Sequence, residues 1–197
     1  LTSTTNPQIS RMDLDTGSGR SYHLRNNSSG QFSIYDDDAS AVRLQVDSSG
    51  AVTKPFNPCF LVRDSTQAVN ITGDGSPYTV IYETETFDQG GYMTTTTFTA
   101  PVTGKYLLTL QVSPTGIASG HTYATYSIKT SNRNYDYTTN PAATQPSGAY
   151  NNETITVIAD MDATDTAYTT ITVNNSSKTV DVGGGVTYGS FAGCLIS

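Results

Sequence analysis

Short runs of alternating apolar and polar residues, separated by clusters of turn-forming residues, recur along this 197-residue chain. The pattern is clearest over residues 20–53, where Tyr22 and Leu24, then Phe32 and Ile34, occupy every second position. Alternation with a period of two is typical of strands with one buried face, and clusters of Asn, Asp, Ser and Gly favour the turns between them. Residues 20–54 are therefore predicted to form a short β-meander.

A second block of strands is predicted after residues 54–58, where two prolines interrupt pairing. The expected strands are residues 59–63, 79–84, 92–99, 106–112, 122–129, 154–159, 168–173 and 191–196. No run combines helical periodicity with end caps. Roughly eight to ten short strands in about 140 residues predict an antiparallel sandwich, barrel or jelly roll.

The chain is thus predicted to have three parts. Residues 1–19 are polar and form a tail or linker, residues 20–54 form a β stem module, and residues 55–197 form a globular head. Each stem strand offers only about two inward side chains, too few for so small a sheet to offset its own ordering entropy. We therefore expect the stem to pack against copies of itself or against a neighbour.

The charge pattern excludes several classes of partner. The formal net charge is −7 and only 14% of residues are charged, so binding to nucleic acid or to an anionic membrane surface is not expected. No stretch approaches the ~20 apolar residues of a membrane-spanning helix, so membrane insertion is not expected either. The chain begins at Leu1 without a Met, and we expect further sequence upstream.

Few residues suggest chemistry. Cys59 and Cys194 are too few for a zinc site, and they become neighbours if the first and last head strands pair. Two small buried thiols are favoured there over a disulfide. Neither His23 nor His121 sits in a His-x-x-x-His pair or beside a cysteine, and His121 is expected to be exposed in a loop. We therefore predict no enzymatic activity and no cofactor.

The densest acidic group of the head is formed by Asp160, Asp162 and Asp165, between two predicted strands. Carboxylate oxygens suit calcium, but the segment lacks the Gly and the terminal Glu of the twelve-residue calcium loop. A solvated hairpin turn at the stem end of the head is the favoured interpretation, and no metal site is predicted.

Residues 98–108, Phe-Thr-Ala-Pro-Val-Thr-Gly-Lys-Tyr-Leu-Leu, resemble the signature of the globular head shared by complement component 1q and the tumour-necrosis-factor superfamily. Residues 87–92, 190–196 and 59–63 are similar to other parts of that head. The resemblance covers about residues 55–197 and implies a jelly roll that forms a homotrimer. The motif also has a structural account, since Pro101 and Gly104 suit a turn.

Joined to the stem, the whole chain resembles the distal part of a tail or head fibre of a bacteriophage or aquatic virus. The stem phrases Asn-Ser-Ser-Gly and Arg-Leu-Gln-Val-Asp-Ser-Ser-Gly are typical of such fibres. This resemblance implies location on the virion, attachment to upstream fibre or virion proteins, and binding to a host cell-surface glycan or protein.

Three loops are expected at the pole of the head far from the stem, namely residues 114–120, 138–150 and 176–188. Tyr, Asn, Gly and Ser suit adaptable recognition. The predicted receptor contacts are Tyr135, Tyr137, Asn140, Gln145, Tyr150 and Tyr188. Packing of Tyr135 and Tyr137 in the sheet or on the trimer axis remains an equal alternative.

Other functions remain open. The chain is alternatively a purely structural fibre or decoration protein whose head drives trimerisation, or a cellular secreted adhesin with the same head. A depolymerase-like enzyme would need converging carboxylates, and the sequence offers no good pair.

Overall fold

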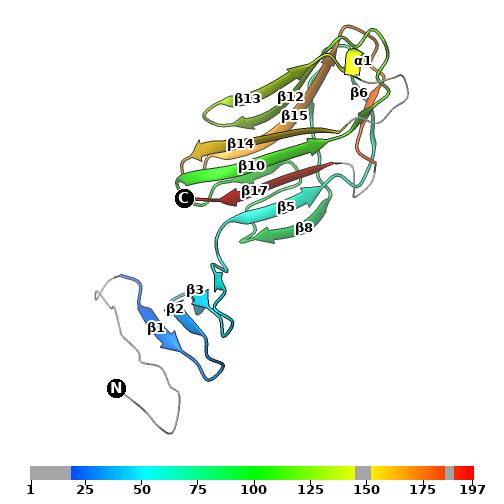
Figure 1. The fold of residues 1–197 in the computed structure, drawn as a ribbon. Coiled ribbons are helices and arrows are strands. Elements are labelled where there is room, and N and C mark those ends of the chain that lie inside the picture. Colours follow the sequence, from blue (N-terminus) through cyan, green and yellow to red (C-terminus); the bar gives the residue numbers. More distant parts are fainter. Residues whose placement is uncertain (1–18, 145–151, 185–188) are drawn as a thin grey trace. The chain divides into compact units, whose positions relative to one another are not determined.

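The computed structural model describes residues 19–144, 152–184 and 189–197. The chain divides between Asn57 and Pro58 into two compact units, which we call the stem and the head (Figure 1). Among the described residues the only helix is the single turn α1 (Pro141–Thr144), and the other elements are antiparallel strands. The prediction of an all-β chain is confirmed.

The stem is a four-stranded antiparallel meander in the order β1-β2-β3-β4. Its strands are β1 (Tyr22–Asn26), β2 (Phe32–Asp36), β3 (Ala41–Val46) and β4 (Val52–Thr53). Side chains of Asn27 and Asp47 accept backbone hydrogen bonds within the turns. Tyr22 and Leu24 lie on β1 and Phe32 and Ile34 on β2, as the alternation in the sequence predicts.

Burial within the stem differs from what the alternation suggests. Leu24, Ile34 and Leu44 lie opposite one another on one face, and none of them is buried. The buried side chains include His23, Ser33 and Asp36. A single small sheet covers its apolar face poorly, so these side chains are only half-buried in one copy of the chain.

The head is a sandwich of two main sheets with a small third one (Figure 1). The first sheet has the order β14-β10-β17-β5-β8, the second β13-β12-β15-β7 with β9 also paired to β15, and the third β11-β16-β6. The strands are β5 (Cys59–Arg63), β6 (Ala68–Thr72), β7 (Tyr78–Thr79), β8 (Thr84–Gln89), β9 (Thr97–Thr99), β10 (Gly104–Val112), β11 (Pro114–Thr115), β12 (Tyr123–Thr130), β13 (Asn134–Thr139), β14 (Glu153–Met161), β15 (Thr166–Asn174), β16 (Val180–Val182) and β17 (Ser190–Leu195).

The core between the sheets is built around the motif of residues 98–108. Tyr106, Leu108 and Leu110 alternate into the core, as the sequence predicts. The Tyr106 hydroxyl donates to the Val102 carbonyl at 2.8 Å, which fixes the preceding turn. Phe60 stacks on Phe98 with 4.7 Å between ring centroids, so the first strand and the motif share one aromatic cluster.

Several strand predictions are wrong in detail. Residues 134–139 form the edge strand β13 and are not irregular, although Asn, Asp and Thr resemble loop composition. Residues 92–99 form a tight hairpin in which Met93 bridges Phe98, because the Thr94–Thr97 turn folds the run back on itself. Residues 80–83 join β7 to β8 and are not strand. Strands β6 and β16 were not predicted, since each is short and pairs only with partners distant in sequence.

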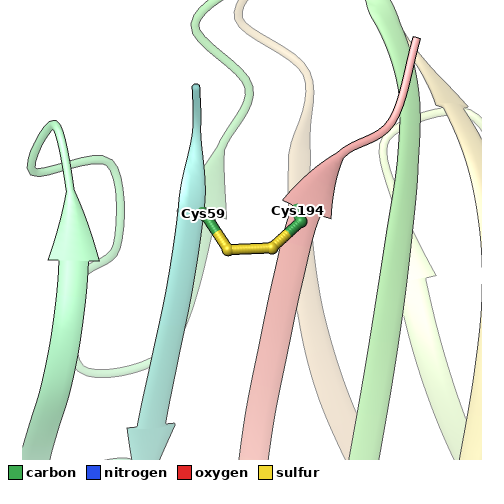
Figure 2. Close-up of a disulfide and its surroundings, with 2 residues drawn as sticks. All are labelled: Cys59 and Cys194. Atoms are coloured by element: carbon green, nitrogen blue, oxygen red, sulfur yellow. A yellow bond between two sulfur atoms is a disulfide. The ribbon is translucent and has the colours of Figure 1, made fainter. Parts of the chain in front are cut away.

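Cys59 and Cys194 form a disulfide between the neighbouring strands β5 and β17 (Figure 2). The expectation that the two residues become neighbours is confirmed, and the preference for free thiols is wrong. The residues lie directly opposite each other with 4.1 Å between their Cα atoms, which places the sulfur atoms within bonding reach. The bond joins the first and last strands of the head.

Candidate recognition surfaces

Three connections meet at the end of the head opposite the C-terminus (Figure 1). They are residues 116–122, the turn around α1 and residues 175–179, and their backbones are linked through His121. The predicted apical loops therefore lie together over the part of them that the structure describes.

His121 links these three connections through hydrogen bonds to their backbones. Its Nδ1 accepts a hydrogen bond from the Ala118 N–H at 2.8 Å, and its Nε2 donates to the Ser177 carbonyl at 2.9 Å. Its own carbonyl accepts from the Ala142 N–H. Because Ala118 can only donate and Ser177 can only accept, the ring is neutral with its proton on Nε2.

The prediction of an exposed loop histidine at position 121 is wrong, because the side chain is fully buried. Gly73 (φ 128°) packs against the same ring, and a Cβ there would lie 2.8 Å from Nε2. The histidine holds backbone groups of these connections together, and both of its ring nitrogens are used for that.

The structure does not bring the predicted receptor contacts together in one site. Tyr135 and Tyr137 lie on β13, opposite the buried Ile128 and Tyr126 of β12, so they face the inside of the sandwich from an edge strand. Asn140 precedes α1, where its side chain accepts from the Ala143 N–H. Gln145, Tyr150 and Tyr188 lie outside the described residues.

The outer face of the first sheet carries apolar side chains that nothing covers in one chain, and we call it the sheet patch. The cross-strand pairing places its residues in two adjacent rows, Ile158–Leu107–Cys194–Cys59 and Thr156–Thr109–Ala192–Leu61–Phe87. Ile158 is 60% exposed and Phe87 44%. The disulfide (Figure 2) joins Cys59 and Cys194, two neighbours in the first of these rows.

A second apolar surface lies where the edge strands of the two main sheets, β13 and β14, leave the sandwich open, and we call it the open edge. Tyr135 and Tyr137 face inward from β13, and Ile155 and Val157 face inward from β14, all of them only partly covered or exposed. The buried Tyr126 hydroxyl beside them makes no hydrogen bond, and burial raises the pKa of this phenol.

Sequence reasoning did not find the sheet patch, although a signal was present. Residues 106–108 and 157–158 are consecutive apolar residues within predicted strands. Consecutive apolar residues in a strand expose apolar surface on both faces, which indicates a sheet that is covered on both sides.

The acidic turn of the head has internal partners. Asp160 pairs with Arg133 at 2.9 Å, and Asp165 accepts from the Asn132 side chain at 2.7 Å. The turn borders a cavity of about 150 Å³ that is also lined by Lys105. Within residues 19–144, 152–184 and 189–197, no three His, Cys, Asp or Glu side chains are grouped to hold a metal ion.

No helix among the described residues is both long and apolar enough to cross a membrane. No protein-family model matches the chain, and no curated protein sequence matches it.

Solved structures do match the head. The globular domain of zebrafish complement 1qA protein aligns with a TM-score of 0.50 at 14% identity, over 71% of this chain and 98% of that one. Murine APRIL, a tumour-necrosis-factor family member, aligns with a TM-score of 0.51 at 12% identity, over 71% of this chain and 99% of that one. At these identities the likeness concerns the fold alone. The head therefore has the jelly-roll fold of these domains, as its motif predicted.

Proposed function

We propose that this chain is a non-enzymatic attachment protein at the tip of a viral fibre. Three copies associate through their heads and stems, and the apical loops bind a glycan or protein on the host cell surface. The observation that carries this proposal is the pair of uncovered apolar surfaces on one head, the sheet patch and the open edge.

The two surfaces differ in position and composition, which favours a ring. When the open edge of one copy packs on the sheet patch of the next, the contact is head-to-tail, and such contacts close into cyclic assemblies. A ring of three is the number that the resemblance to complement 1q and tumour-necrosis-factor heads implies. The open edge supplies Tyr135 and Tyr137, and tyrosine is enriched at the centres of interfaces.

The stem, like the head, has an apolar face that association with other copies would bury. Its face with Leu24, Ile34 and Leu44 is only half-buried in one chain, and contact among three stems would bury it further. Association of stems and heads together gives one cooperative unit, in which each part supports the other.

Three features favour attachment over catalysis: the bonding of His121, the presentation of one surface three times, and the disulfide. Both ring nitrogens of the apical histidine are engaged in hydrogen bonds with backbone groups. A surface presented three times raises weak single-site binding through effective concentration. The disulfide suits a protein that works outside the cell, as a virion surface protein does.

The oligomer is tested by light scattering at dilute concentration on three variants. We expect wild-type protein to have three times the mass of one chain, and Ile158→Asp and Leu107→Asp to be monomers, because a charge in the sheet patch cannot be buried unpaired. Val69→Asp is the matched control, since Val69 is 59% exposed but lies on β6, away from the patch. A wild-type monomer, or a trimer that tolerates both patch variants, contradicts the proposal.

A structural fibre protein without a receptor is the second candidate, and the same apolar surfaces favour it. It predicts the same trimer but no binding on a glycan array or to cells, and loss of fibre assembly when the head is deleted. The two functions therefore separate in the binding measurement and not in the mass measurement.

A further inference from the structure

Asp64 is a buried carboxylate that makes no hydrogen bond. It follows β5 directly, is 3% exposed, and both of its side-chain oxygens are buried without a hydrogen-bond partner. Buried charges in proteins are normally paired or bound to a metal ion, because the loss of hydration costs several kcal/mol. An aspartate kept in such a place needs a partner that the protein alone does not supply.

Two glycines, Gly183 and Gly189, pack directly against this carboxylate. A Cβ on Gly189 would collide with the carboxylate, and a Cβ on Gly183 would lie 2.7 Å from its Oδ2. Gly183 also has φ 80°, a conformation that favours glycine. Two segments distant in sequence thus close around Asp64 with backbone and no side chain, which leaves the carboxylate facing main-chain atoms.

The groups near Asp64 are oxygen ligands. A Cβ on Gly183 would lie 2.7 Å from Asp64 Oδ2 and 3.2 Å from the carbonyl oxygen of Thr66, so both oxygens face the same glycine. Glu83 is held beside it, since its Oε2 accepts from the Ser65 N–H at 2.9 Å and the Thr66 N–H at 3.4 Å. This arrangement places two carboxylates and a carbonyl around one segment, residues 64–66.

The electrostatic environment of Asp64 is unfavourable to its charge. Burial and then the negative charge of Glu83 raise the pKa of Asp64 to about 6. The backbone N–H groups of Asp64 and Gly189 lie close enough to offset part of this rise, although neither carboxylate oxygen has a well-formed hydrogen bond. At neutral pH two negative groups therefore stand together, and a cation would relieve both.

We propose that Asp64, Glu83 and the Thr66 carbonyl form a binding site for one calcium ion. Calcium takes six to eight oxygen ligands in flexible geometry, including carboxylates, main-chain carbonyls and water. The group offers oxygen only, which disfavours zinc. With two carboxylates the affinity falls in the weak range, a Kd of about 10⁻⁴–10⁻³ M, typical of extracellular modules.

Binding would tie together three segments of the head. They are the end of β5, the start of β8 beside Glu83, and the two glycines that pack on Asp64, Gly183 after β16 and Gly189 before β17. The site differs from the Asp160–Asp165 turn, in which the carboxylates of Asp160 and Asp165 already have partners.

The test is a calcium titration of the whole chain after removal of metal with a chelator, at pH 7.5 and constant ionic strength. Thermal unfolding and terbium luminescence are followed over roughly 10 µM to 10 mM ion, the range that covers such sites. We expect calcium to raise the Tm of wild-type protein and magnesium to act more weakly. Asp64→Asn should weaken calcium binding at least tenfold, and Glu83→Gln should weaken it less.

Asp64→Asn is isosteric and removes the unpaired charge, so the variant is expected to fold. Asp162→Asn is the control, because it removes a carboxylate from the acidic turn at the other end of the head. The proposal is overturned when wild-type protein shows no calcium response, when Asp64→Asn keeps the response, or when Asp162→Asn alone loses it. A wild-type protein stabilised by acid but not by calcium also overturns it, because a proton then satisfies Asp64.

Discussion

Three buried polar residues show how differently buried polar side chains are paired in this chain. His121 has both ring nitrogens bonded to backbone groups and closes the apical connections. Asp36 is buried in the stem, where Arg20 and Arg43 neutralise it at 2.9 and 2.6 Å. Asp64 has no such partner. Buried polar groups are stable when they are paired, so the unpaired one is the candidate for a ligand.

The charge of Asp36 should make the stem sensitive to acid. Burial alone would raise the pKa of Asp36, but hydrogen bonds from Arg43 and Ala39 and the charges of Arg20 and Arg43 lower it below its ordinary value. A lowered native pKa contributes stability above the pKa of the unfolded chain, about 4. That contribution should be present at neutral pH and lost as the pH falls from about 4 through the native pKa.

The measurement is hydrogen exchange of peptides within residues 20–46, with each variant compared with wild-type protein at the same pH. Asp36→Asn should exchange faster than wild-type protein at pH 7 and equally fast near pH 2, where the wild-type carboxylate is protonated. Asp38→Asn, which loses one hydrogen bond to the Ser21 N–H, is the control. A difference between Asp36→Asn and wild-type protein that persists unchanged into acid would contradict this account.

At the scale of elements, the sequence predicts strands best where only one face of the strand is buried. Strand β10 was predicted nearly in full because Tyr106, Leu108 and Leu110 alternate into one core. Strand β13 was not predicted, because Asn134, Asp136 and the threonines after it are polar, as an edge strand allows. The alternation of Tyr135 and Tyr137 was the available signal for a strand.

The recognition surfaces were harder to predict than the strands. The sheet patch depends on the lateral order of five strands, and that order is a property of the tertiary fold. The glycines beside Asp64 come more than one hundred residues later in the chain, so no local pattern connects them with it. The candidate site therefore required the structure, although each of its residues is visible in the sequence.

The disulfide is the one covalent link between the ends of the head. It joins residues 135 positions apart in sequence, so it restricts the unfolded chain strongly. Replacing both cysteines, Cys59→Ser with Cys194→Ser, should lower the free energy of unfolding by about 2–5 kcal/mol. Urea unfolding of wild-type protein with and without reductant measures the effect, and the double variant should not respond to reductant. Two free thiols titrated in unreduced, unfolded wild-type protein would show that the bond does not form.

At the scale of the whole molecule, the stem and the head present the same physical problem. Each has an apolar face that one chain leaves uncovered, Leu24 with its neighbours in the stem and the sheet patch in the head. An isolated sheet that buries little apolar area is marginally stable. We therefore expect association and stability to be linked, so that the chain's melting temperature depends on its concentration.

Multivalent binding is the property that separates an attachment fibre from a structural one. If three tips act together, wild-type protein should bind a dense glycan surface about 10²–10⁴-fold more tightly than the monomeric Ile158→Asp variant. On a sparse surface, where only one site can engage, the two proteins should bind alike, because the apical loops of the monomer are unchanged. Binding measured on surfaces of graded glycan density tests this, with Val69→Asp as the trimeric control. Equal binding by monomer and trimer on the dense surface would remove avidity from the mechanism, and binding by neither would favour the structural role.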